Sequence, residues 1–509
     1  MAWTPAQQAA IDKRGANILV SAAAGSGKTA VLTERVMKRI IGSETEAPIE
    51  IDRFLIVTFT SAAAGEMKER ITAKLGEQMQ KLQAEENMED PKIIKQMNYL
   101  ERQMALVHKA SISTIHSFCL KTIKAYFNRL DIDPNIKVGN QAELEIMKME
   151  ILEELLEERF EEEDPEFLAL AEVYGNVQGM APLIQLILEV YTFSKSTPFP
   201  EVWLKKQVAS LKTPYTDVAQ MPWAPAIHKS IYEQVKDLKI IYNDALALCH
   251  APNGPALYAP TLEGDIAPLE DIDENTDINR LITAVKSISF AALSRKKQEC
   301  DEVLKEKVKE YRDLAKDIVK DIQGDLAFIQ DPKLIAQLPK VGELMGYLVD
   351  LIKVFEDRYS EAKQKAGVVD YSDLEHLCMK LLVVPEFDEN GEYIGVSYTE
   401  VAKELGAFYK EVYIDEYQDS NTVQETILGA VALANEEAKT TRFMVGDMKQ
   451  SIYRFRLANP LIFAEKYENY AKHEEDMEVD SKENDQETHH AIKDICIDLS
   501  QNFRSRNNL

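Results

Sequence analysis

Residues 18–42 read ILVSAAAGSGKTAVLTERVMKRIIG, and this stretch decides the fold of the first part of the chain. An apolar run precedes a glycine-rich turn, and Leu32, Val36 and Ile40 then recur every four residues, which predicts a strand, a tight loop and a helix. Gly42 stands where helices commonly end. Such a loop points backbone N–H groups at one spot, where the helix dipole also favours an anion. The stretch therefore predicts a phosphate-binding loop.

The alternation of strand and helix continues on both sides of a long helical region. Apolar runs at 54–59 and 110–115 lead into helical patterns, and further apolar runs stand at 411–414 and 442–445. This predicts an α/β fold with a parallel sheet covered by helices on both faces. Between these runs, 141–365 consists of long amphipathic Leu/Glu/Lys-rich patterns. We expect a nucleotide-binding domain in two parts, 1–140 and 366–472, around a large inserted α-helical domain, followed by an acidic loop at 473–490.

Composition restricts the class of protein. The 509 residues are 45% hydrophobic and 28% charged, as in ordinary globular proteins, and no uncharged apolar run is long enough for a membrane span. The N-terminus has no export signal, and five scattered cysteines indicate neither disulfides nor a metal site, so we expect a cytoplasmic protein without membrane contact. The net charge of −27 argues against nucleic acid as a partner unless a groove is locally positive.

The phosphate loop carries a definite chemistry. Lys28 can reach the β- and γ-phosphates of a nucleotide, and the Thr29 hydroxyl can bind Mg²⁺. The strict loop pattern requires glycine at position 22, where this chain has alanine, and a chance turn of small residues is the alternative interpretation. Alone, the motif indicates only a nucleoside triphosphate. The candidate nucleotide-binding residues are Ala22, Ala23, Ala24, Gly25, Ser26, Gly27, Lys28 and Thr29.

A second motif, IDEYQD at 414–419, places two carboxylates after an apolar strand. Asp415 would lie beside a phosphate-bound Mg²⁺, and Glu416 would polarise a water molecule. Two acids in a solvated turn are the alternative interpretation. Taken with the phosphate loop, a carboxylate placed for water favours a hydrolase over a kinase.

The order of motifs resembles the superfamily-1 UvrD-type helicases. After Gln7, the motifs are AAAGSGKT (22–29), FTSAAAGEMKER (59–70), TIHSF (114–118), DEYQDS (415–420), VGDMKQSIYRFR (445–456) and QNFRSR (501–506). Two longer stretches, VVDYSDLEH (368–376) and LSQNFRSR (499–506), resemble the AddA subunits of the bacterial AddAB helicase–nucleases. The resemblance is dense over 1–130 and 365–509 and implies a RecA-like P-loop domain.

The resemblance implies further nucleotide contacts. Gln7 matches the residue that hydrogen-bonds the adenine edge, and a side-chain amide offers the required donor and acceptor. Gln450 matches the residue that senses the γ-phosphate and couples it to DNA. Arg504 matches an arginine that contacts the γ-phosphate, and Phe503 matches the aromatic residue that packs on adenine. The implied catalytic residues are Lys28, Asp415, Glu416, Gln450 and Arg504, with Thr29 and Asp415 on the metal.

A second implied set contacts DNA. Aromatic rings there would stack bases, which tolerates any base sequence, and hydroxyl, imidazole and guanidinium groups would bind backbone phosphates. For His116 taken alone, a histidine with a purely structural role is the alternative. Asp370 and Asp373 belong to a family signature without an assigned chemical role. The DNA set is Phe59, Thr60, Thr114, His116, Ser117, Tyr453, Arg454, Phe455 and Arg456.

The resemblance as a whole implies an ATP- and Mg²⁺-dependent 3′→5′ DNA helicase module acting on single strands and duplex ends. Its family setting is recombinational repair of double-strand breaks by end resection, with an AddB-like partner. We expect the second RecA-like domain to begin within 491–509 and to be cut short, with no nuclease domain and with impaired activity. A nucleotide-binding scaffold acting through its acidic helical region is the alternative, and an unrelated phosphotransferase is a more distant one.

Overall fold

A computed structural model describes residues 3–23, 25–43, 45–84, 90–130, 132–175, 179–296, 298–326, 329, 332–435, 440–451, 457–473 and 494–499. The chain divides into two compact units. Unit 1 holds 1–162, 175–203 and 352–509, and unit 2 holds 163–174 and 204–351. Of the helices in the described ranges, none combines the length and apolarity needed to cross a membrane.

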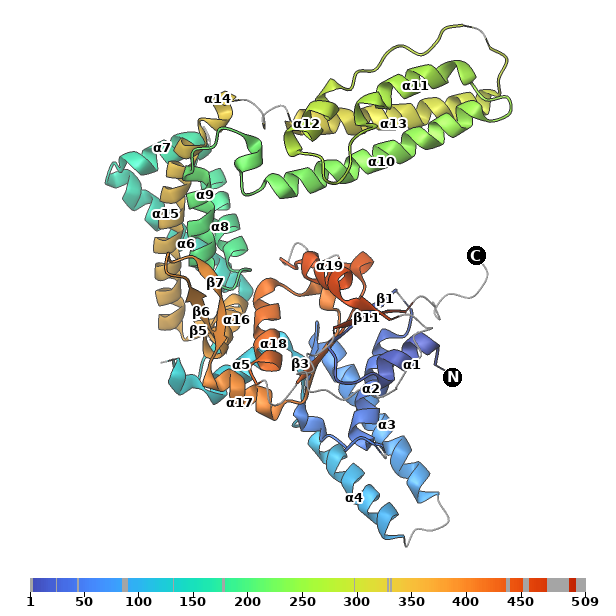
Figure 1. The fold of residues 1–509 in the computed structure, drawn as a ribbon. Helices are drawn as coiled ribbons and strands as arrows, with labels where there is room; N and C mark the ends of the chain where they lie inside the picture. The colour runs from blue at the N-terminus through green and yellow to red at the C-terminus, as the bar shows by residue number, and fades with distance from the viewer. Residues whose placement is uncertain are drawn as a thin grey trace. The chain divides into compact units, whose positions relative to one another are not determined.

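A seven-stranded sheet forms the centre of unit 1 (Figure 1). Its order is β10-β11-β1-β9-β8-β2-β3, and every neighbouring pair is parallel. The predicted α/β fold is thereby confirmed. The strands are β1 (Ile18–Ala22), β2 (Phe54–Thr58), β3 (Ser111–Thr114), β8 (Glu411–Ile414), β9 (Thr441–Gly446), β10 (Ala471–Lys472) and β11 (Ile495–Leu499).

The central strands are apolar because both faces of the sheet are buried. In β1, Leu19 packs into the hydrophobic core on one face, while Ile18 and Val20 pack into the core on the other. Successive side chains of a strand point to opposite faces, so an unbroken apolar run serves both cores.

Helices cover both faces of this sheet (Figure 1). One face is covered by α1 (Pro5–Asp12), α2 (Lys28–Ile41), α3 (Ser61–Gln83) and α4 (Pro91–Leu106). The other is covered by α5 (Ile115–Ala125), α16 (Tyr371–Leu382), α17 (Glu400–Phe408), α18 (Thr422–Leu433) and α19 (Pro460–Asn469).

The helical insertion leaves and rejoins the α/β part at a short stem. There β4 (Lys137–Val138) pairs in parallel with β5 (Val368–Val369), and the Gly139 N–H donates to the Val369 carbonyl at 2.9 Å. The stem lies within a few residues of the predicted boundaries, 141 and 365. The division into compact units falls at other positions, because unit 1 also includes 141–162, 175–203 and 352–365 of the predicted insertion. In the chain, the stem is followed by α6 (Gln141–Glu161) and rejoined by α15 (Leu338–Ala366). Helix α8 (Ala181–Ser194) belongs to unit 1, and the division between the units falls within α9 (Pro200–Lys212) and within α15.

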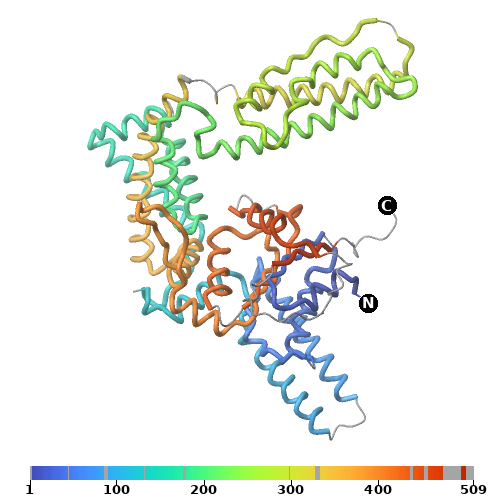
Figure 2. Tube along the Cα trace, viewed as in Figure 1, coloured from blue at the N-terminus to red at the C-terminus, as the bar shows by residue number. Residues whose placement is uncertain are grey.

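Unit 2 is helical and has its own core. Its helices are α7 (Pro165–Tyr174), α10 (Ala224–His250), α11 (Ala259–Ile266), α12 (Ile278–Ser287), α13 (Glu302–Leu326) and α14 (Pro332–Ile335). The long helices α10 and α13, green and yellow in Figure 2, pack along one another around this core. Inside the unit, the Arg312 guanidinium donates to both carboxylate oxygens of Asp265, at 2.6 and 3.1 Å.

Two strand assignments differ from the sequence prediction. Residues 495–499 were expected in a second RecA-like domain, but β11 pairs with β1 from Ile18↔Ile495 to Ala22↔Leu499 and so belongs to the first sheet. The boundary at 491 is therefore wrong for these residues, because their apolar side chains fill both cores of unit 1. The hairpin of β6 (Val383–Phe387) and β7 (Tyr393–Tyr398) was not predicted, although Asp388 and Gly391 form a typical turn between its strands.

A buried ionic cluster joins the sheet to α18 and α19. The Glu425 carboxylate accepts hydrogen bonds from Arg442 Nη1 at 2.8 Å and Tyr417 Oη at 2.7 Å, and Lys466 Nζ lies 3.0 Å away. Burial opposes ionisation of Glu425, but Arg442 and then Lys466 outweigh it and lower the pKa of the carboxyl.

We expect Glu425→Gln to lower the free energy of unfolding at pH 7 by about 3 kcal/mol, because it leaves Arg442 buried without its countercharge. The difference from the wild type is complete above the ordinary glutamate pKa of 4.5. Below that pH it shrinks, because the unfolded chain takes up a proton at Glu425 first, and it is lost as the pH falls through the lowered pKa of the folded protein. Urea unfolding at pH 7 and below pH 4.5 measures both effects. Glu400→Gln, at an exposed carboxylate paired with Lys403, is the matched control. An equal loss in both variants would contradict the role of the cluster.

Candidate functional site

Three predicted motifs meet at one edge of the sheet because the strands before them are neighbours. Strand β1 pairs with β9, and β9 pairs with β8, all in parallel. Their carboxyl ends therefore lie side by side and lead into the phosphate loop, Asp447 and Asp415 respectively. In open parallel sheets this edge is where ligands bind.

The phosphate loop has the backbone of an anion cradle. Gly25 and Gly27 adopt left-handed conformations, with φ of 78° and 87°. No side chain caps the first turn of α2, which leaves its N–H groups for a ligand. Ser26 Oγ is buried and has no hydrogen-bond partner among the residues that the structure describes. Ala22 is the buried last residue of β1, in extended backbone, so its position does not require the glycine of the strict pattern.

Lys28 already has a partner at this edge. Its Nζ lies 3.1 Å from Glu416 Oε2, so the predicted phosphate ligand contacts the predicted water-polarising carboxylate. Glu416 has a left-handed backbone, φ 52° and ψ 47°, which is uncommon for a residue other than glycine. Strain of this kind persists where the surrounding structure fixes a side chain in place.

Among the described residues, Asp415, Glu416 and Asp419 carry more negative charge than Lys28 balances. Burial and the charge of Glu416 raise the pKa of Asp415 to about 6, and the same two causes raise that of Asp419 to about 6. Asp419 Oδ1 is also buried, and no described residue forms a hydrogen bond with it. This surplus fits a divalent cation held by Asp415 and Thr29. Within the described ranges, no group of three or more His, Cys, Asp or Glu side chains could hold a metal alone, so phosphate oxygens and water would have to complete its coordination.

Gln418 is a residue that the sequence prediction missed. It is 1% exposed and lies in the short turn η6 (Tyr417–Asp419). Its Nε2 donates to Glu416 Oε2 at 2.8 Å, and its Oε1 accepts from the Asp447 N–H at 3.0 Å. Gln450 in turn donates to Asp447 Oδ2 at 2.7 Å. A side chain on Gly446 would collide with Gln418 Oε1, so glycine there makes room for the link.

Gln7 is used in a way that the sequence did not indicate. Its Oε1 accepts from the Thr4 N–H at 3.1 Å in a capping box, and its Nε2 donates to the Ser26 carbonyl at 2.9 Å. The Gln7 side chain therefore links the start of α1 to the phosphate loop. One Nε2 hydrogen remains for the predicted adenine contact.

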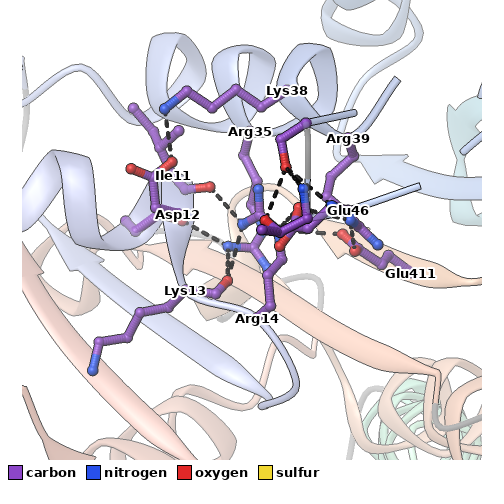
Figure 3. Close-up of polar contacts among 12 residues, drawn as sticks. Ile11, Asp12, Lys13, Arg14, Arg35, Lys38, Arg39, Glu46 and Glu411 are labelled. Atoms are coloured by element: carbon purple, nitrogen blue, oxygen red, sulfur yellow. Dashed lines mark hydrogen bonds and ion pairs between the residues drawn. The ribbon is translucent and has the colours of Figure 1, made fainter. Parts of the chain in front are cut away.

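The helix that carries Gln7 is anchored at its other end (Figure 3). Arg35 of α2 is 1% exposed, and its Nη1 donates to the carbonyls of Ala10 at 2.8 Å and Lys13 at 2.7 Å. Its guanidinium also lies over the Phe443 ring at 4.7 Å, and its Nε is 4.0 Å from Glu411. Glu411 begins β8, so these contacts join α1, α2 and β8 at the edge of the sheet opposite the phosphate loop.

The predicted DNA-contact residues in the described ranges follow β2 and β3. These strands are neighbours, with Thr58 opposite Thr114. Thr60 caps α3 by accepting from the Ala63 N–H at 3.1 Å, and Thr114 caps α5 by accepting from the Ser117 N–H at 3.3 Å. Two helix N-termini with hydroxyl caps therefore lie at this end of the edge, beside Phe59, and such termini attract phosphate groups.

The His116 side chain contacts two residues of α16. Its Nε2 lies 3.1 Å from the buried carboxylate of Glu375, and its ring packs on Tyr371 with centroids 4.7 Å apart. Tyr371 is 52% exposed, so the pair presents an aromatic surface to solvent. Neither partner could be identified from the sequence, because the contact joins helices more than 250 residues apart in the chain. Several predicted site residues lie outside the described ranges: Ala24, Tyr453, Arg454, Phe455, Arg456, Phe503 and Arg504.

The fold and the edge motifs together define a P-loop nucleotide-binding domain. Residues 3–471 match the model of the UvrD/REP helicase N-terminal domain, and the chain belongs to this family. It is 39% identical, over 99% of its length, to the A subunit of the ATP-dependent helicase/nuclease of Alkaliphilus metalliredigens, and 39% identical over 93% to that of Moorella thermoacetica. The protein of the same name from Listeria monocytogenes is also 39% identical over 99% of this chain. The chain spans 38%, 33% and 38% of these relatives, respectively.

We expect Lys28→Ala to weaken binding of Mg²⁺–ATP by about tenfold or more, since a hydrogen bond to a charged group contributes about 1.5–3 kcal/mol. Titration with a fluorescent ATP analogue measures the change. Lys403→Ala removes an exposed lysine that pairs with Glu400 on α17 and is expected to bind like the wild type. Undiminished binding by Lys28→Ala would refute the assignment of the phosphate loop.

Proposed function

We propose that this chain is the ATP-binding motor lobe of a 3′→5′ DNA helicase–nuclease that resects DNA ends in double-strand-break repair. The observation that carries the proposal is the single sheet edge that holds the phosphate loop, the Asp415–Glu416 pair and, after the adjoining strands β2 and β3, two hydroxyl-capped helix N-termini. Family membership and the names of the relatives support the same proposal.

The nucleotide chemistry follows from the contacts at this edge. Lys28 exchanges its contact with Glu416 for the β- and γ-phosphates, which frees Glu416 to accept a proton from the attacking water. Gln418 keeps Glu416 oriented during this exchange. A Mg²⁺ ion on Thr29 and Asp415 would neutralise phosphate charge. Gln450, linked through Asp447 to Gln418, would report the γ-phosphate to the rest of the lobe.

Single-stranded DNA would run past the ends of β2 and β3. Phe59 and the exposed Tyr371, which packs on the half-buried His116 ring, would stack bases, and this works for any base sequence. The capped N-termini of α3 and α5 would bind phosphates without a high local density of basic side chains. This reconciles DNA as a partner with a net charge of −27.

The remaining parts of the proposal concern the setting. ATP and Mg²⁺ are the cofactors, the cytoplasm is the location, and the partner is an AddB-like protein. The relatives are each named as one subunit of a helicase/nuclease, which supports the existence of a partner. Unwinding would need a second motor lobe that closes on this one with each ATP.

DNA-stimulated ATP hydrolysis at low salt tests this function. We expect single-stranded DNA to raise the rate, and Glu416→Gln to lower the stimulated rate by about 10²–10⁴-fold while nucleotide binding is kept, because only proton acceptance is lost. Glu386→Gln, an exposed glutamate on β6, is the matched control. Nucleotide binding without any stimulation by DNA would favour a scaffold that acts through protein partners.

A further inference from the structure

Glu375 is a buried carboxylate in the VVDYSDLEH signature, to which the proposed function gives no role. Its Oε1 accepts a hydrogen bond from Gln424 Nε2 at 2.7 Å and lies 3.1 Å from His116 Nε2. Its Oε2 accepts a hydrogen bond from Asn421 Nδ2 at 3.2 Å. Glu375 is 5% exposed, so one buried charge contacts side chains at the starts of two other helices. We name Glu375, His116, Asn421 and Gln424 the Glu375 junction.

Both helices of the junction present their N-terminal turns to Glu375. His116 is the second residue of α5, while Asn421 is the N-cap of α18 and Gln424 lies in its first turn. The positive ends of two helix dipoles therefore favour the negative charge between them. Burial opposes that charge, but the contacts with His116, Gln424 and Asn421 outweigh it and lower the pKa of Glu375. The junction is thus held by an ionised acceptor, which an amide could replace only in part.

The two helices come from different parts of the functional edge. Helix α5 follows β3 and carries the proposed DNA contacts His116 and Ser117. Helix α18 follows the acidic turn that contains Asp415 and Glu416, with Asn421 only two residues after Asp419. Glu375 therefore contacts the start of α18, which follows the proposed nucleotide site, and the start of α5, which carries proposed DNA contacts.

Helix α16, which carries Glu375, is fixed at its own start. Asp370 and Asp373 form a capping box there, and both contact the buried ammonium of Lys363 in α15, at 2.9 and 2.6 Å. The start of α16 is held in this way. A movement of α18 that displaced the Glu375 side chain would therefore also change its contact with His116. The acidic residues of the signature thus differ in their contacts. Asp370 and Asp373 hold the start of α16, and Glu375 connects α16 to α5 and α18.

We propose that Glu375 is a positioning residue through which the nucleotide site and the single-stranded DNA site affect one another. The inference rests on the proposed function, since it takes His116 and its surroundings to contact DNA. A shift of the turn at 415–421 on nucleotide binding would pull on Asn421 and Gln424 and, through Glu375, reorient His116 against Tyr371. Coupling between two sites acts equally in both directions.

The test measures the affinity of the 509-residue chain for a fluorescein-labelled oligothymidylate by anisotropy, without nucleotide and with saturating Mg²⁺ and a non-hydrolysable ATP analogue. We expect the analogue to change the affinity of the wild type by about fivefold or more, the lower range of coupling in proteins, and that of Glu375→Gln by less than about twofold. A fluorescent ATP analogue should bind both with similar affinity. A side chain with only a structural role would leave the size of the nucleotide effect unchanged.

Two further variants make the result specific. Gln424→Met removes one contact on the nucleotide side and keeps the Glu375 carboxylate, so it should reduce the nucleotide effect on DNA affinity even if Glu375→Gln does not fold. Glu404→Gln is the matched control, because Glu404 accepts a hydrogen bond from Tyr126 just beyond the far end of α5, at 2.9 Å, and should behave like the wild type.

Each other outcome has a definite meaning. A full nucleotide effect in both Glu375→Gln and Gln424→Met overturns the role of Glu375. A wild type that binds both ligands without any mutual effect also overturns it, while the proposed function stands. A wild type that binds nucleotide but no single-stranded DNA refutes the proposed function, and the inference with it.

Discussion

The parallel direction of all seven strands is the constraint on which the rest of this structure depends. Parallel strands end at the same edge, so loops that are hundreds of residues apart in the chain meet there. The edge gathers Lys28, Asp415, Glu416 and Asp419 within a partly buried space. The raised pKa values of Asp415 and Asp419 are a direct result of this crowding. The site is in this sense a consequence of topology, and its chemistry follows from the charges that the topology brings together.

Buried glutamates connect this sheet to its helices. Glu411 meets Arg39 at 2.6 Å at the amino edge, Glu425 meets Arg442 behind the sheet, and Glu375 meets His116 near the carboxyl edge. Buried ion pairs add little to stability on balance, because desolvation offsets their attraction. They do fix one arrangement against others, because each unpaired partner would be costly. In this lobe they hold α2, α18 and α5, the helices that begin at the functional edge.

The sequence predicted the parts of the site that consist of adjacent residues. The loop at 22–29, the acidic pair at 415–416 and the strands before them are local patterns of apolar runs and turns, and the structure confirms the strands. Gln418, Tyr371, Glu375 and Arg35 were missed because their importance lies in contacts across the fold. The assignment of 495–499 to another domain failed for a related reason, since an apolar strand does not specify which sheet it joins. Only the pairing of Ile18 with Ile495 decides that.

The strand order also determines when each strand can pair while the chain is being synthesised. Strands β1 and β2 are not neighbours; β9 and β8 lie between them, and both are made only after residue 410. At a ribosomal rate of about 5–20 residues per second, the roughly 300 residues between β3 and β8 take about 15–60 s to emerge. During that time β1 has neither of its partners, and β2 has only β3. Apolar strands left open for so long invite wrong pairing, so the nascent chain depends on protection until its middle strands arrive.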